Sequence, residues 1–83
     1  MNKILVKIFV PAVKDSFDMF VPADIQIQDV TRVIASGVVE ITNGKYLTSG
    51  FEQLCLKEPA GLLNPSLTLV DYGVCDGTQL YLI

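Results

Sequence analysis

Hydrophobic and polar residues alternate along the first part of the chain with the period of two that is typical of β-strands. In residues 4–10 the even positions are all β-branched and share one face, while positions 5, 7 and 9 lie on the other. Residues 11–15 interrupt this pattern, and residues 16–21 resume it. The pattern therefore predicts a hairpin of two antiparallel strands.

The next segment changes to the spacing of a helix. Apolar residues recur at intervals of three or four, which predicts an amphipathic stripe; its members are Ile27, Val30, Ile34, Val38 and Ile41. Gly37 costs about 1 kcal/mol relative to alanine within a helix, so packing on a sheet must hold this segment. The helix is predicted to end near Gly37 or at Ile41, before the stop signal of Asn43 and Gly44. Residues 38–50 are left open as helix, loop or an extra strand.

Shorter segments complete the chain. Alternation around Leu54 and Leu56 predicts a third strand, residues 62–63 predict a brief edge strand, and residues 79–83 predict a final strand. Thr68 is expected to cap a single helical turn that ends at Gly73. The length of 83 residues predicts a single domain over residues 1–83. Because one helix covers only one face of a sheet, we expect an α+β fold in which the helix packs across one face and leaves the other exposed to solvent. Its mixed four- to five-stranded sheet has the first and last strands parallel at the centre.

Composition and charge exclude several classes of function. The chain is 51% hydrophobic and 18% charged, which predicts a folded domain. Its net charge is −3 and its six basic residues are scattered, so nucleic acid is not an expected partner. Histidine is absent, and two isolated cysteines do not complete a metal site, so we expect no cofactor and no histidine-dependent catalysis. No apolar run reaches the ~18 residues of a membrane span, and residues 1–10 fit a strand better than a signal peptide. We therefore expect a cytoplasmic protein.

Two short motifs carry a family resemblance. Residues 68–74, Thr-Leu-Val-Asp-Tyr-Gly-Val, precede the strand that contains Leu-Tyr-Leu at 80–82, and with the order of elements they resemble the ubiquitin-like β-grasp superfamily. Residues 20–25, Phe-Val-Pro-Ala-Asp-Ile, and residues 71–80 resemble the YukD/EsaB small proteins of bacterial type VII secretion. This resemblance implies a non-catalytic adaptor or regulatory protein that binds a larger component of the secretion apparatus.

Two other functions remain as alternatives. The sequence stops at Ile83 without the diglycine tail that conjugated members of the superfamily carry. A ubiquitin-like modifier or sulfur carrier is therefore expected only if the native chain is longer. A self-associating structural protein, such as a homodimer, is the second alternative, because an apolar face on a small domain is readily buried by a two-fold partner.

Period two also predicts a protein-binding surface. If the even-numbered leucines of the third and last strands face the helix, the alternate positions of neighbouring strands form one patch on the open side of the sheet. The predicted protein-binding residues are Leu5, Lys7, Phe9, Cys55, Lys57, Tyr81 and Ile83. Scattered exposed apolar residues are ordinary, whereas a contiguous patch indicates a partner surface. Ubiquitin-like domains commonly bind partners through this sheet face, so the resemblance agrees. A nucleophilic role for Cys55 is not expected, because only a nearby lysine could lower its pKa.

Overall fold

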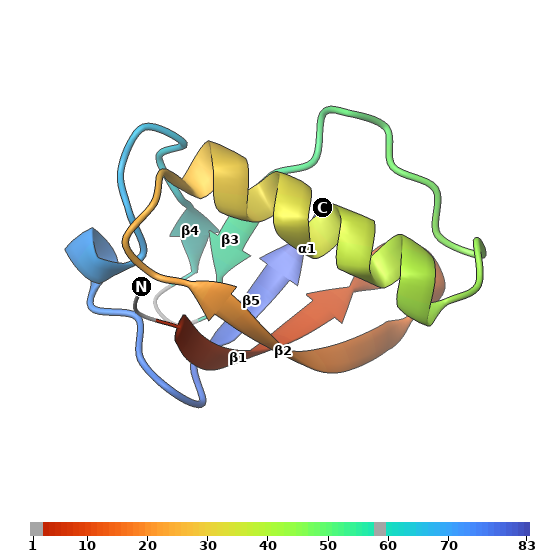
Figure 1. The fold of residues 1–83 in the computed structure, drawn as a ribbon, viewed down its shortest axis with the longest axis horizontal. Coiled ribbons are helices and arrows are strands. Elements are labelled where there is room, and N and C mark those ends of the chain that lie inside the picture. Colours follow the sequence, from red (N-terminus) through yellow and green to blue (C-terminus); the bar gives the residue numbers. More distant parts are fainter. Residues whose placement is uncertain (1–2, 58–59) are drawn as a thin grey trace.

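The computed structural model places one helix across one face of a five-stranded mixed sheet (Figure 1). It describes residues 3–57 and 60–83. The strands are β1 (Lys3–Val10), β2 (Asp15–Pro22), β3 (Leu54–Leu56), β4 (Gly61–Leu62) and β5 (Gln79–Leu82), and the helix is α1 (Ile27–Ile41). Two short 3₁₀ turns, Pro11–Val13 and Val70–Tyr72, join these elements. The predicted α+β class and the predicted order of strands and helix are confirmed.

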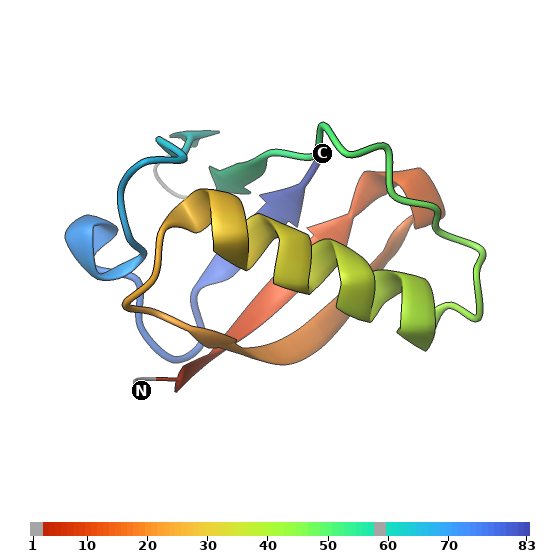
Figure 2. The same ribbon diagram turned by 45° about the horizontal axis from the view of Figure 1, so that its top comes forward.

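The first and last strands are parallel neighbours, as predicted. The strand order is β2-β1-β5-β3-β4, and every neighbouring pair except β1 with β5 is antiparallel. Ile8 of β1 is paired with Leu80 of β5, and Leu80 is paired with Leu56 of β3. Parallel strands need a long crossover connection. The chain between β2 and β3 carries α1 over one sheet face, and no α-helix of residues 3–57 and 60–83 covers the opposite face (Figure 2).

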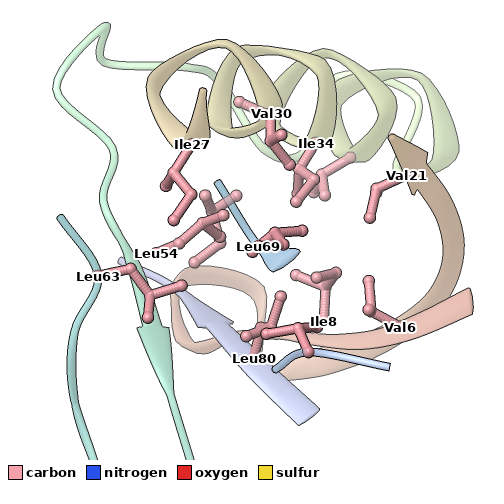
Figure 3. Close-up of a cluster of buried hydrophobic side chains, with 14 of the residues drawn as sticks. Val6, Ile8, Val21, Ile27, Val30, Ile34, Leu54, Leu63, Leu69 and Leu80 are labelled. Carbon is pink, nitrogen blue, oxygen red and sulfur yellow. The ribbon is translucent and has the colours of Figure 1, made fainter. Parts of the chain in front are cut away.

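The core lies between α1 and the helix-facing side of the sheet. Figure 3 shows apolar side chains from α1 meeting those from the strands and from the segment that follows β4. The labelled ones are Val6, Ile8, Val21, Ile27, Val30, Ile34, Leu54, Leu63, Leu69 and Leu80. The even positions 6, 8 and 10 of β1 are fully buried, which confirms the predicted alternation. Two expected core residues differ from the pattern. Leu56 is only half-buried at the end of β3, and Ile41 is exposed because it is the last residue of α1.

Helix α1 continues through Gly37 and ends at Ile41. The missing side chain at Gly37 makes room for Met19 of β2, because a Cβ atom there would collide with the Met19 Cε methyl group. Beyond the helix, the Thr42 hydroxyl donates to the Val38 carbonyl at 2.8 Å. Asn43 and Gly44 then adopt positive φ angles of 53° and 84°, which confirms the predicted stop signal. Residues 42–50 form turns and an irregular loop rather than a strand.

The predicted helical turn before β5 is present and ends at Gly73, but Leu69 rather than Thr68 holds its N-cap position. The Thr68 hydroxyl accepts a hydrogen bond from the Asp71 amide at 3.2 Å, and the Asp71 carboxylate accepts one from the Thr68 amide at 2.9 Å. Gly73 ends the turn with a φ of 69°. The Tyr72 hydroxyl also accepts a hydrogen bond from the Asn64 amide at 2.8 Å. Asp71 and Tyr72 therefore have structural partners, and this turn delivers the chain to β5.

One carboxylate organises the loop between α1 and β3. Glu52 Oε2 accepts hydrogen bonds from the Tyr46 hydroxyl at 2.7 Å and from the Ser49 amide at 2.9 Å, and Oε1 accepts one from the Gly50 amide at 3.2 Å. Burial acts to raise the pKa of Glu52, but hydrogen bonds from Thr48, Tyr46 and Ser49 outweigh it and lower that pKa to about 2. Burial, followed by the hydrogen bond and charge of Glu52, raises the pKa of Tyr46 to about 12.

We expect Glu52→Gln to lower the free energy of unfolding at pH 7 by about 1 kcal/mol, because a charged acceptor is lost. The pKa of Glu52 is lower in the folded state, so its stabilising effect is present above about pH 4.5 and disappears as the pH falls toward 2. Urea unfolding of the wild type and Glu52→Gln at several pH values measures this. The two curves should converge in acid, while Glu40→Gln controls for the loss of one negative charge. A gap that stays constant with pH would contradict the prediction.

Candidate protein-binding face

The sheet face opposite α1 is here termed the open face, and it carries one continuous row of side chains across all five strands. Residues that are directly paired in neighbouring strands project from the same side of a sheet. The register therefore aligns one residue from each strand, and we term this set the transverse row. Its members, in order from β2 to β4, are Ser16, Phe9, Tyr81, Cys55 and Leu62. Four of the five side chains are apolar or aromatic.

Two aromatic rings form the middle of the transverse row. The ring centroids of Phe9 and Tyr81 are 5.6 Å apart, and their planes are inclined by 72° in an edge-to-face arrangement. Such a pair contributes about 0.5–1.5 kcal/mol beyond the area that it buries. Phe9 is exposed and Tyr81 is half-buried, so the pair presents an ordered aromatic surface to solvent. Large, rigid side chains of this kind are the residues that most often anchor protein partners.

Two lysines lie in the row of the open face next to this aromatic pair, one on each side of Gln79. Lys7 lies opposite Asp18 of β2 and Gln79 of β5 in the register of the sheet. Lys57 follows β3, and its amide donates to the Gln79 carbonyl at 3.3 Å, so β5 lies between the two lysines. Both lysines, the aromatic pair and Gln79 line a hollow of about 390 Å³. The open face thus combines an apolar centre with positive charge at its border.

All seven residues predicted from the alternation lie on the open face by register and position. Lys7, Phe9 and Lys57 are exposed, and Cys55 and Tyr81 are half-buried. Leu5 is half-buried opposite Phe20, and the exposed Ile83 exchanges two backbone hydrogen bonds with Gln53, at 2.8 and 3.0 Å. Their role in binding a partner stays a prediction.

The structure adds two exposed apolar residues that the sequence analysis missed. Phe20 is 68% exposed on β2, and Leu62 is 60% exposed on β4. The alternation of residues 16–21 already placed Phe20 opposite the core, so extending the patch to the second strand would have found it. Leu62 gave no such signal, because a strand of two residues has no periodicity and only its pairing with Cys55 fixes its side of the sheet.

The thiol on this face has an environment that disfavours its ionisation. Burial raises the pKa of the Cys55 thiol, so the lysines nearby do not turn it into a reactive thiolate. Cys55 and Cys75 are both free. Within residues 3–57 and 60–83, no three acidic or cysteine side chains gather where a metal ion could be held. In the same residues, no helix has the length and apolar character that crossing a bilayer requires.

Comparison with known proteins gives a likeness of structure but not of sequence. Neither a model of a known protein family nor a curated protein matches the chain. The ubiquitin-like domain of the Mycobacterium tuberculosis type VII secretion system protein EccD1 is similar, with a TM-score of 0.79 and 18% identity over 100% of this chain and 99% of that one. The EccD5 ubiquitin-like domain from Mycobacterium xenopi gives a TM-score of 0.74 and 20% identity over 100% of this chain and 94% of that one.

An archaeal protein named as a ubiquitin is similar as well. Caldiarchaeum subterraneum ubiquitin gives a TM-score of 0.66 and 21% identity over 99% of this chain and 92% of that one. Likenesses at these identities show a shared fold and leave function to be argued from the surface. The mixed sheet with its parallel central pair, the single crossing helix and these three structures lead to one conclusion: the chain has the ubiquitin-like β-grasp fold, similar to that of EccD ubiquitin-like domains of type VII secretion.

Proposed function

We propose that this protein is a cytoplasmic, non-catalytic adaptor or regulatory protein of a bacterial type VII-like secretion system. It binds a larger component of that system through the open face. The observation that carries the proposal is the transverse row, in which contiguous apolar side chains extend across four strands, from β1 to β4. The fold similarity to two EccD ubiquitin-like domains and the resemblance of residues 20–25 and 71–80 to YukD/EsaB proteins support the secretion context.

Binding through this face requires little rearrangement of the protein. Backbone hydrogen bonds already fix the strands, and the edge-to-face contact holds the Phe9 and Tyr81 rings against each other. A partner that covers these rings removes apolar surface from water without having to order a mobile segment first. The aromatic pair then acts as the buried centre of the interface, with Lys7 and Lys57 at its rim.

Crosslinking in native cells tests the proposal. The protein is isolated after mild treatment with an amine-reactive crosslinker, and mass spectrometry identifies the attached proteins and the attached lysines. Recovery of a membrane component or ATPase of a type VII apparatus, joined through Lys7 or Lys57, supports the proposal. Joining mainly through Lys14 or Lys45, which lie outside the open face, would place the interface elsewhere.

The same experiment separates the two alternatives. A ubiquitin-like modifier would be recovered with an activating enzyme, or joined covalently to lysines of other proteins without added crosslinker. A self-associating protein would yield mainly crosslinks between copies of this chain. Light scattering of the purified protein at high concentration then gives its oligomeric state directly.

The two free cysteines provide matched variants that test the interface. We expect Cys55→Arg to weaken the partner complex at least tenfold, because it replaces a small side chain between Tyr81 and Leu62 with a long one that keeps the partner from the transverse row. Cys75→Arg is the control, because Cys75 is exposed in the turn before β5. Affinity is measured by calorimetry with the recovered partner, and circular dichroism checks folding. Equal affinities for the two variants would contradict the role of this face, and unfolding by Cys55→Arg alone would contradict the placement of residue 55.

A further inference from the structure

Positive charge gathers on the open face of a protein that is acidic as a whole. The chain has nine acidic and six basic residues. Lys3 and Lys7 of β1 have the same alternation as Phe9, and Lys57 borders the same hollow. Among the described residues, Asp18 is the one acidic side chain on the strands of this face, and it lies opposite Lys7. Three of the six basic residues thus lie on this face, against one acidic residue among its described strand positions.

The charges and the apolar groups of this face are arranged for one kind of ligand. Both Lys7 and Lys57 line the same hollow as the Phe9 and Tyr81 rings, one on each side of β5. A chain that crosses the hollow can place an apolar side chain against the rings while its neighbouring residues reach the ammonium groups. Lysine is a compact cation whose flexible stem lets it follow carboxylates in more than one position.

We propose that the open face binds an extended acidic segment of its protein partner, in which an aromatic or aliphatic residue is flanked by Asp or Glu. This inference rests on the proposed function and specifies the chemistry of the partner. The apolar residue packs against the Phe9 and Tyr81 rings, and carboxylates on either side pair with Lys7 and Lys57. Charge complementarity of this kind sets specificity and speeds association more than it adds affinity.

Two other anionic ligands fit the face less well. Proteins that bind nucleic acid through its backbone typically neutralise several phosphates, and this face offers three lysines. Stable attachment to an anionic membrane takes a larger polybasic cluster or a lipid anchor. The apolar transverse row beside the two lysines is suited instead to side chains of a protein. Nucleic acid and membranes are therefore outcomes against which the proposal is tested.

Selection from a random library of 12-residue peptides displayed on phage tests the proposal with the full chain as bait. We expect enriched peptides to combine Asp or Glu with a central aromatic or aliphatic residue. A labelled peptide from the enriched set is then titrated by fluorescence anisotropy at 50 and 500 mM NaCl. We expect the Lys7→Gln/Lys57→Gln double variant to bind it roughly tenfold more weakly at low salt, and wild-type affinity to fall at high salt.

The double variant Lys14→Gln/Lys45→Gln removes the same net charge outside the open face and should change affinity less than twofold. Circular dichroism establishes that both double variants are folded. The proposal is overturned if no peptides are enriched, if the enriched peptides are uncharged or basic, or if both double variants lose affinity equally. It is also overturned if single-stranded DNA, or vesicles of phosphatidylcholine and phosphatidylserine at 3:1, bind the protein more tightly than the peptides do.

The partner complex separates this inference from the proposed function. If Tyr81→Ala weakens the complex with the recovered secretion component and the Lys7→Gln/Lys57→Gln variant does not, the open face is the docking site but the acidic chemistry is wrong. If neither variant weakens that complex, the proposed function fails as well. If both weaken it, the acidic-segment proposal is supported in the native partner.

Discussion

Leu80→Ala is expected to lower the free energy of unfolding by about 2–5 kcal/mol, because it removes a buried side chain that its surroundings cannot replace. Leu80 is fully buried on β5, the middle strand of the sheet. Ile8 lies opposite it on one side and Leu56 on the other. A domain of this length has a total stability of roughly 4–12 kcal/mol, so this one substitution removes a large part of it.

Urea unfolding followed by circular dichroism measures the effect, with the wild type and Gln79→Ala compared in parallel. Gln79 is the preceding residue of β5 and is exposed on the open face, so its replacement should change stability by less than about 0.5 kcal/mol. A loss below about 1 kcal/mol for Leu80→Ala would mean that the core reorganises around the missing side chain. A larger loss for Gln79→Ala than for Leu80→Ala would reverse the assignment of the two faces.

Tyr81→Ala is expected to weaken the partner complex by about 30-fold or more, which is the effect of removing an aromatic anchor at the centre of an interface. Tyr81 lies at the middle of the transverse row, with Phe9 and Cys55 as its paired neighbours. The substitution also removes the edge-to-face contact with Phe9, so stability should fall by about 1–2 kcal/mol while the protein stays folded.

Phe51→Ala is the matched control for this experiment. Phe51 is 87% exposed in the loop before β3 and lines a groove beside α1, outside the open face. Its removal should leave affinity for the partner within about twofold of the wild type. Calorimetric titration of both variants with the recovered secretion component decides the question. Equal losses for Tyr81→Ala and Phe51→Ala would show that the partner does not distinguish the open face from other exposed aromatic surface.

The alternation of side chains predicted the sheet and its two faces, because period two is a local property that each strand carries in its own sequence. Positions 6, 8, 80 and 82 are buried and positions 7 and 9 are exposed, as the pattern requires. The turn at residues 68–73 was also predictable, since Thr68 and Asp71 satisfy backbone groups within a few residues of themselves.

Features that depend on contacts between distant segments were not predictable in the same way. The end of α1 was left open because Gly37 weakens a helix. The glycine fits at this position because Met19, which belongs to β2, fills the space beside it. Leu62 joins the open face through the register of β4 with β3, which its own two-residue strand does not encode. The hydrogen bonds of Glu52 likewise depend on a loop conformation that residues 42–53 reach only together.

The pKa of Cys55 also depends on contacts between segments that are distant in the sequence. The sequence showed only nearby lysines, which would lower the pKa of Cys55. In the folded protein, burial beneath the neighbouring side chains of the row raises that pKa. The effect of burial depends on what lies on the adjacent strands, and β5 is separated from β3 by more than twenty residues of sequence. Reactivity of a strand cysteine is therefore decided by sheet assembly rather than by its neighbours along the chain.

The transverse row takes one side chain from each of the five strands, and its middle member comes from the last of these five in the sequence. No hairpin or partly assembled sheet can display it, since β5 must insert between β1 and β3 before Phe9, Tyr81 and Cys55 adjoin one another. A partner that recognises the row therefore binds only chains in which the sheet is fully assembled. By mass action, such a partner stabilises the folded state.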